Sequence, residues 1–125
     1  MFLGILQFDL LIHDAQSLKD KRRVVKSVKD RLHREHMISV AEVGAQEIWN
    51  VARMGAAVVA GSGGYVSDVL DRVTAKLRTL PDAELGDCTR EIIKADQLPG
   101  DSLAEDGSPL WTPEEKRDRD ANTNA

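Results

Sequence analysis

Basic side chains recur at helical spacing between residues 17 and 36. This segment holds eight Lys and Arg residues against three acidic ones. At about 100° per residue, five side chains form one continuous strip with the spacing i, i+3, i+7, i+10 and i+14: Lys19, Arg22, Lys26, Lys29 and His33. Each cation that meets a phosphate displaces a counterion, so the strip suits a nucleic-acid backbone, and His33 could join when protonated. The alternative is a solvated helix face that carries charge for solubility.

Histidines and carboxylates elsewhere lack the partners that metal binding or acid–base catalysis needs. His33 and His36 could share a metal, but no third ligand and no His-Glu-x-x-His motif accompanies them. Asp9, Glu42 and Glu91 fall on expected strands, and nothing in the sequence pairs them as acid and base. We therefore expect a non-enzymatic protein with no catalytic residue, no metal and no cofactor.

A glycine-rich segment at 61–64 precedes the second expected helix. Free backbone amides at a helix start can bind an anion. No Gly-Lys-Ser/Thr follows, as a Walker A loop requires, and Val66 occupies the place of the third glycine of a dinucleotide fingerprint. We therefore interpret this segment as a flexible turn.

Aromatic side chains are scarce where an RNA-recognition sheet would need them. The expected third strand, 51–60, contains none, so a nucleic-acid contact should be electrostatic and come from the helix side. Trp49 lies in the short connection before this strand. We expect it to pack against the edge of the domain and to fix the connection.

The expected elements alternate in the order β-α-β-β-α-β. Strands are expected at 2–13, 38–45, 51–60 and 84–94, from alternating or β-branched residues. Ser17 and Asp20 resemble the capping box of a first helix at 17–36. The second helix follows from apolar residues at 3-4 spacing that stop before Pro81: Val66, Val69, Leu70, Val73, Leu77 and Leu80. The sequence predicts an α+β protein of the ferredoxin-like βαββαβ type, with two helices on one face of a four-stranded antiparallel sheet.

Apolar residues occur on both sides of the first expected strand. Phe2, Leu6 and Leu10 alternate onto one face, whereas Leu3 and Ile5 fall on the other. Two helices can cover only one face, and an exposed apolar patch usually marks an interface. We therefore expect a homodimer formed through the sheet, or a cover supplied by the tail.

The composition divides the chain at residue 94. Residues 1–94 carry 14 basic and 13 acidic residues, whereas 95–125 carry 3 basic and 8 acidic residues together with three of the four prolines. Such a segment buries too little apolar area to order itself. We expect one domain at 1–94 and a disordered acidic tail at 95–125, in which Thr112, Pro113 and Glu115 could start a short helix or a fraying turn.

The sequence gives no sign of a secretory signal or of a membrane span. The N-terminal apolar run lacks a preceding basic region, and no apolar run approaches the roughly 20 residues that a bilayer requires. The single cysteine, Cys88, has no second Cys to pair with, so we interpret it as a small, buried apolar side chain. We expect a cytoplasmic protein with no membrane partner.

The run from Ser17 to Ser27, Ser-Leu-Lys-Asp-Lys-Arg-Arg-Val-Val-Lys-Ser, is distinctive. It resembles the YlxP-like family of small bacterial proteins, long described as a domain of unknown function. The likeness continues through 39–43, Gln46, Trp49 and 55–59, and it covers about residues 1–94. The sequence departs from the family pattern at 61–64 and at Gly44-Ala45, where a more polar pair is usual.

This resemblance implies a ferredoxin-like fold in a bacterial, cytoplasmic protein. Family genes often neighbour those of translation initiation and ribosome-binding factors, which implies a ribosome- or RNA-associated role. The family supplies no catalytic residues to carry over. The leading hypothesis is therefore an RNA- or ribosome-associated factor, and the alternative is a homodimeric interaction module with no nucleic-acid ligand.

Overall fold

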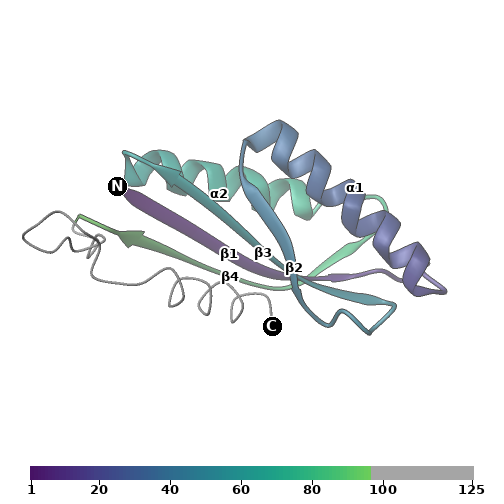
Figure 1. The fold of residues 1–125 in the computed structure, drawn as a ribbon. Helices are drawn as coiled ribbons and strands as arrows, with labels where there is room; N and C mark the ends of the chain where they lie inside the picture. The colour runs from purple at the N-terminus through teal and green to yellow at the C-terminus, as the bar shows by residue number, and fades with distance from the viewer. Residues whose placement is uncertain (97–125) are drawn as a thin grey trace, which may run out of the picture. The chain divides into compact units, whose positions relative to one another are not determined.

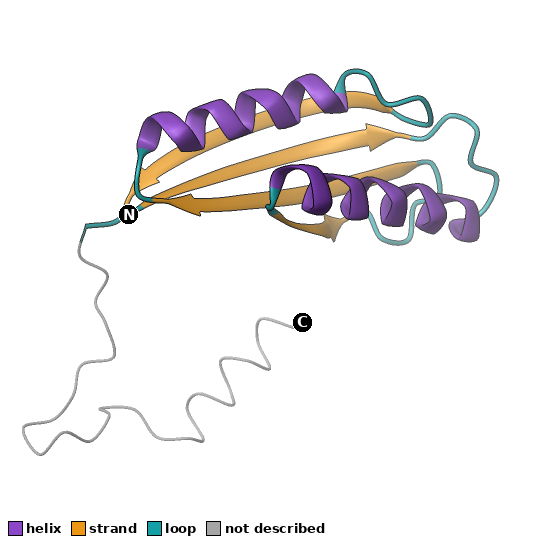
Figure 2. Cartoon of the chain, turned by 90° about the horizontal axis from the view of Figure 1, so that it is seen from above, coloured by secondary structure: helices purple, strands orange, loops and turns teal. Residues whose placement is uncertain are grey.

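Four strands and two helices make up the part of the chain that the computed structural model describes, residues 1–96. In chain order they are β1 (Phe2–Leu11), α1 (Leu18–His36), β2 (Ser39–Gly44), β3 (Val51–Ala60), α2 (Gly63–Leu77) and β4 (Glu84–Lys94). The strands form one antiparallel sheet in the order β2-β3-β1-β4 (Figure 1). Both helices lie on the same face of this sheet (Figure 2). The predicted ferredoxin-like βαββαβ plan is confirmed.

The strand β1 lies at the centre of the sheet and has two different faces. Leu6, Phe8 and Leu10 are buried beneath the helices, whereas Ile5 and Gln7 at the alternate positions are exposed. This two-residue alternation is what the pleat of a strand imposes. Within residues 1–96 no helix covers the second face, so the apolar residues on it are covered by nothing that the structure describes.

The helices cover the sheet by means of their predicted apolar stripes. α1 lies over β2 and β3, and α2 lies over β1, β3 and β4. The buried residues include Val25, Val28 and Leu32 of α1, and Cys88 of β4 packs against the same core while half-buried. Glycine at position 4 lets α2 approach closely, because a Cβ there would collide with Val66.

Element ends differ from the predictions where the chain leaves the regular pattern. β1 ends at Leu11 rather than at 13, because the chain turns at His13 and Asp14, where the Ala15 N–H donates to the Ile12 carbonyl at 3.2 Å. β2 begins and ends one residue inside its predicted range of 38–45. Helix α2 ends at Leu77, so Leu80 lies beyond it and is half-buried.

The glycine-rich segment at 61–64 is part of a helix start, so its interpretation as a flexible turn is wrong. Ser62 is the N-cap of α2, and its hydroxyl accepts a hydrogen bond from the Tyr65 N–H at 3.3 Å. Gly63 and Gly64 are the first two helical residues. A serine cap compensates for the poor helix propensity of the glycines that follow it.

None of the helices within residues 1–96 is long and apolar enough to cross a bilayer. The predicted acidic tail, including the turn or helix at Thr112–Glu115, falls outside the described residues apart from Ala95 and Asp96.

Candidate nucleic-acid interface

The helix α1 has a defined cap at each end. The Ser17 hydroxyl accepts from the Asp20 N–H at 3.2 Å, and the Asp20 carboxylate accepts from the Gln16 N–H at 3.1 Å. The predicted capping box is thus present with one difference. The Asp20 carboxylate accepts from the Gln16 N–H instead of the N–H of the N-cap residue Ser17. At the other end Met37 takes a left-handed conformation with φ 56°, and its N–H donates to the His33 carbonyl at 2.9 Å. Both ends of the strip-bearing helix are therefore fixed.

The rotation of α1 places the predicted strip on the flank that faces away from α2. Val25, Val28 and Leu32 point into the core. On one flank, Glu35 forms an ion pair with Lys76 of α2, with 3.4 Å between carboxylate oxygen and Nζ. At about 100° per residue, the strip falls on the opposite flank. Its members there are exposed, apart from a half-buried Lys29: Lys19, Arg22, Lys26, Lys29 and His33.

The strip keeps most of its positive charge uncompensated. Only Lys26 has an acidic partner among residues 1–96, namely Asp30 at 3.6 Å, and both side chains are well exposed. Asp30, which the sequence places at the border of the strip, therefore neutralises part of it. Exposed pairs of this spacing stabilise a helix by only about 0.3–0.5 kcal/mol, so Lys26 can exchange Asp30 for a phosphate at little cost.

His33 has one ring nitrogen engaged. Its Nδ1 lies 3.0 Å from the Ile38 carbonyl, and because a carbonyl only accepts, Nδ1 must carry the proton. The ring is thereby oriented with Nε2 as the nitrogen left for an outside partner. This residue can join a phosphate contact only through Nε2.

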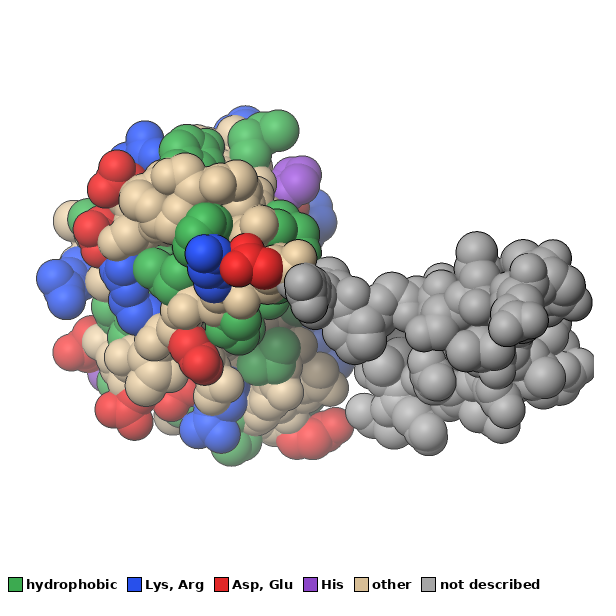
Figure 3. Space-filling view, turned by 90° about the vertical axis from the view of Figure 1, so that its left-hand side faces the viewer, with side chains coloured by type: hydrophobic (Ala, Val, Ile, Leu, Met, Phe, Trp, Pro, Cys, Tyr) green, Lys and Arg blue, Asp and Glu red, His purple; other side chains and the backbone are tan. Residues whose placement is uncertain are grey.

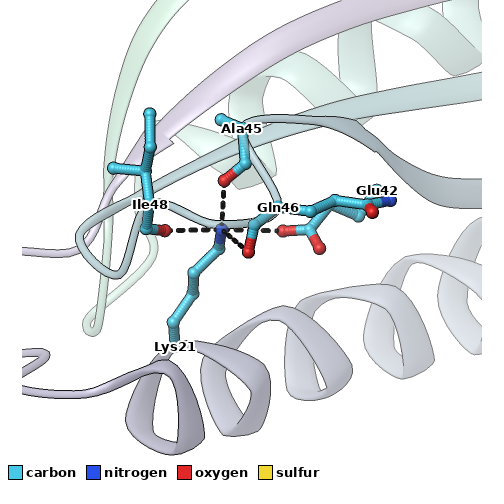
Figure 4. A network of polar contacts seen from close by, with 5 residues as sticks. All are labelled: Lys21, Glu42, Ala45, Gln46 and Ile48. Carbon is cyan, nitrogen blue, oxygen red and sulfur yellow. Dashed lines mark hydrogen bonds and ion pairs between the residues drawn. The ribbon is translucent and has the colours of Figure 1, made fainter.

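One basic residue of α1 is not a surface charge at all. Lys21 is 1% exposed, and it lies on the same stripe as Val25, Val28 and Leu32. Its Nζ lies 2.6 Å from the Ala45 and Ile48 carbonyls, 3.5 Å from the Gln46 carbonyl and 3.2 Å from a carboxylate oxygen of Glu42 (Figure 4). The net charge of +5 counted for this helix from the sequence therefore overstates what α1 offers to a partner. We did not identify Lys21 as a buried residue from the sequence. The spacing could have shown it, because Lys21 lies four residues before Val25 and seven before Val28 of the apolar stripe.

The connection between β2 and β3 is held by this buried ammonium group. The Ala45 carbonyl also accepts the Ile48 N–H at 3.0 Å, which closes a turn, and Ala45 has a positive φ of 58°. Trp49 in this connection is 46% exposed, so the prediction that it packs and fixes the connection is wrong. Lys21 performs the fixing instead.

The other predicted candidates are placed apart from the strip. His36 is half-buried, with Nε2 4.0 Å from Glu35, and residues 1–96 bring together no group of three or more His, Cys, Asp or Glu side chains that could hold a metal. Asp9 accepts from Arg53 on the open face of the sheet, at 3.0 Å to Nε. This hydrogen bond and the carboxylate charge raise the pKa of Arg53, so the guanidinium stays charged at any physiological pH.

The face of the domain that Figure 3 shows does not repeat the pattern of the strip. On the face shown in Figure 3, basic and acidic side chains of the described residues are interspersed with apolar ones. On the other flank of α1 and at its end, Glu35 compensates Lys76. The strip differs from this face in gathering side chains of one sign of charge.

Comparison with known proteins settles the family. The model of a protein family of unknown function, DUF503, matches residues 3–90. This chain belongs to the DUF503 family. A relative from Bacillus subtilis (strain 168), the uncharacterized protein YlxP, is 33% identical over 82 residues, covering 66% of this chain and 89% of that protein. The DUF503 match includes all of α1, β2, β3 and α2.

Among solved structures, the chain is similar to a de novo designed protein with a ferredoxin fold. That likeness covers 84% of this chain and 93% of the designed chain at 16% identity, with a TM-score of 0.41.

Proposed function

We propose that this chain is a non-enzymatic factor that binds RNA, ribosomal RNA included, in the cytoplasm through the strip on α1. The observation that carries the proposal is the gathering of Lys19, Arg22, Lys26 and Lys29 on one flank, with a single weak acidic partner among residues 1–96. His33 stands in line with them and offers Nε2.

The dimensions of the strip suit a run of phosphates rather than one small anion. Lys19 and His33 are fourteen residues apart, which at 1.5 Å per residue spans about 21 Å of helix. A single anion would need cations converging on one point, whereas these are spread along an axis. A nucleic-acid backbone presents its charges in the same linear manner, and release of its counterions drives binding.

Ribosome co-sedimentation from a bacterial lysate at low and high salt tests the proposal. The parent should sediment with ribosomes at low salt and be released at high salt, because the contacts are electrostatic. A variant with Arg22→Ala, Lys26→Ala and Lys29→Ala should stay in the supernatant at both.

A matched control removes the same charge from elsewhere. Arg23, Arg34 and Arg72 are exposed and lie off the strip. Their triple Ala variant should sediment as the parent does. If both triple variants sediment equally, the strip is not the contact.

A second candidate is a homodimer formed through the open face of the sheet. Val59 is 59% exposed there and pairs with Leu3, which in turn pairs with Ile93 on β4. Asp9 and Arg53, toward the end of β1, form an ion pair with no net charge, and Glu91 opposite Ile5 adds one negative charge to this face. The exposed apolar side chains beside them make a second copy a suitable cover for this patch.

Light scattering tests this candidate. The parent should be a dimer and Val59→Asp a monomer with an unchanged circular dichroism spectrum. A parent that is monomeric at every concentration contradicts the dimer and leaves the strip proposal untouched.

A further inference from the structure

The backbone on both sides of Trp49 is fixed by hydrogen bonds to other elements. The Ile48 carbonyl accepts from Lys21 Nζ at 2.6 Å, and the Asn50 carbonyl accepts from the Ile12 N–H at 2.9 Å. Residues immediately before and after Trp49 are thereby tied to α1 and to the end of β1. The tryptophan therefore projects from a rigid backbone, although it lies in a loop.

Two neighbouring side chains of this connection are large, apolar and uncovered, beside the exposed Gln46 and Glu47. Trp49 is 46% exposed and Ile48 is 47% exposed, and Val43 at the end of β2 is exposed as well. Exposed large apolar side chains gathered in one connection are typical of a contact surface. A structural tryptophan would be buried, whereas this one has half its surface in solvent and a backbone held in place.

The residue that holds this loop also belongs to the strip-bearing helix. Lys21 lies in the first turn of α1, between Lys19 and Arg22 in the sequence. These two cations are within one helical turn of Lys21, about 5.4 Å along the axis. The contact of Lys21 with Ile48 thus places the connection that carries Trp49 at the same end of α1 as Lys19 and Arg22, which project from other sides of the helix than Lys21.

We propose that Trp49 is a base-stacking platform and that the RNA bound by the strip is single-stranded where it passes the β2–β3 connection. This inference rests on the proposed function of the strip. Proteins that bind single strands combine cations that follow the backbone with aromatic rings on which bases stack. In a duplex the bases are paired and stacked on one another, so the ring would gain nothing from it. The strip supplies the first component and Trp49 the second.

Tryptophan fluorescence provides the direct readout. Trp111 is the other tryptophan of the chain, so Trp111→Phe makes Trp49 the single reporter. Single-stranded poly(A) should quench this fluorescence on binding, whereas inorganic polyphosphate of equal charge should bind the strip without quenching. Trp49→Ala should weaken poly(A) binding roughly 5- to 150-fold, the range of one stacked base. It should leave polyphosphate binding unchanged.

Two further variants separate the possible outcomes. Trp49→Phe keeps an aromatic ring and should retain most of the poly(A) affinity, and all variants must show the circular dichroism spectrum of the parent. If the parent binds neither polymer, the proposed function of the strip is wrong and this inference falls with it. If the parent binds poly(A) but Trp49→Ala binds equally well, or if Trp49 fluorescence is not quenched, the platform is refuted while the strip stands.

Discussion

The ammonium group of Lys21 lies 3.2 Å from the carboxylate of Glu42, and the two side chains are 1% and 20% exposed. Two backbone carbonyls at 2.6 Å and that of Gln46 at 3.5 Å complete the surroundings of the lysine. A charge in the core is tolerated only when it is paired and hydrogen-bonded. Lys21 meets this condition, and in doing so it joins the first turn of α1 to β2 and to the connection that carries Trp49.

Replacing Lys21 by methionine should destabilise the protein strongly. The variant leaves Glu42 as a buried charge without its partner and releases the Ala45 and Ile48 carbonyls, which should cost about 3–5 kcal/mol of unfolding free energy. Urea denaturation measures the change. In the double variant with Glu42→Gln the loss should be smaller than the sum of the two single losses, because the orphaned charge is gone. A loss below about 1 kcal/mol for Lys21→Met would show that the pair is not structural.

Met37→Gly should stabilise the protein. Met37 is 80% exposed and has a φ of 56°, so the side chain contributes little packing and the backbone conformation is unfavourable for any residue with a Cβ. Glycine at such a helix end should raise the unfolding free energy by about 1 kcal/mol. Met37→Ala keeps the Cβ and serves as the control. If the two variants have the same melting temperature, strain at this helix end is not significant.

Gly4→Ala should destabilise the contact between β1 and α2. A methyl group at position 4 would collide with Val66 and press on Leu70 and Val58, each 3.1 Å from the new Cβ. Overpacking of this kind costs about 1–3 kcal/mol. Adding Val66→Ala to the same chain should recover part of the loss in thermal denaturation. No recovery would mean that strain in the strand, rather than the collision, is the cause.

The local part of this structure can be predicted from the sequence, and the long-range part cannot. The Ser17 cap and the stripe through Val25 and Val28 depend on neighbours three or four residues away, so the pattern alone indicates α1. Lys21 depends on carbonyls 24 to 27 residues further along the chain, which only the packing of α1 against β2 brings within reach. The exposure of Trp49 also depends on how the β2–β3 connection packs, which neighbours in the sequence do not determine.

The beginning of α2 was predicted wrongly for a different reason. Ser62 is a good N-cap in sequence, but two following glycines favour a turn by composition. The buried contacts of Val66, Val69 and Leu70 stabilise the helix enough to include those glycines. Tertiary packing thus outweighs local propensity at this point.

Truncation of the acidic tail should tighten RNA binding. Residues 97–125 carry seven acidic and three basic residues, and a tethered segment competes for the strip at a high effective concentration. Ending the chain after Asp96 keeps the bond from the Ala95 N–H to the Met1 carbonyl, at 2.9 Å, and so keeps the end of β4 intact. Fluorescence anisotropy with a labelled single-stranded RNA compares the two chains at low salt. Equal affinity would show that the tail does not compete, and it would not affect the strip proposal.

The salt dependence of RNA affinity tests the central claim most directly. Binding of a single-stranded RNA should be titrated at several salt concentrations between roughly 50 and 200 mM. The proteins compared are the parent, the strip variant Arg22→Ala, Lys26→Ala, Lys29→Ala, and the control variant Arg23→Ala, Arg34→Ala, Arg72→Ala. Since each phosphate contact on a single strand contributes about 0.7 to the log–log slope, the strip variant should bind more weakly with a slope shallower by about 2, and the control variant should keep the parental slope. A strip variant that binds with the affinity and slope of the parent would contradict the RNA-binding role of α1.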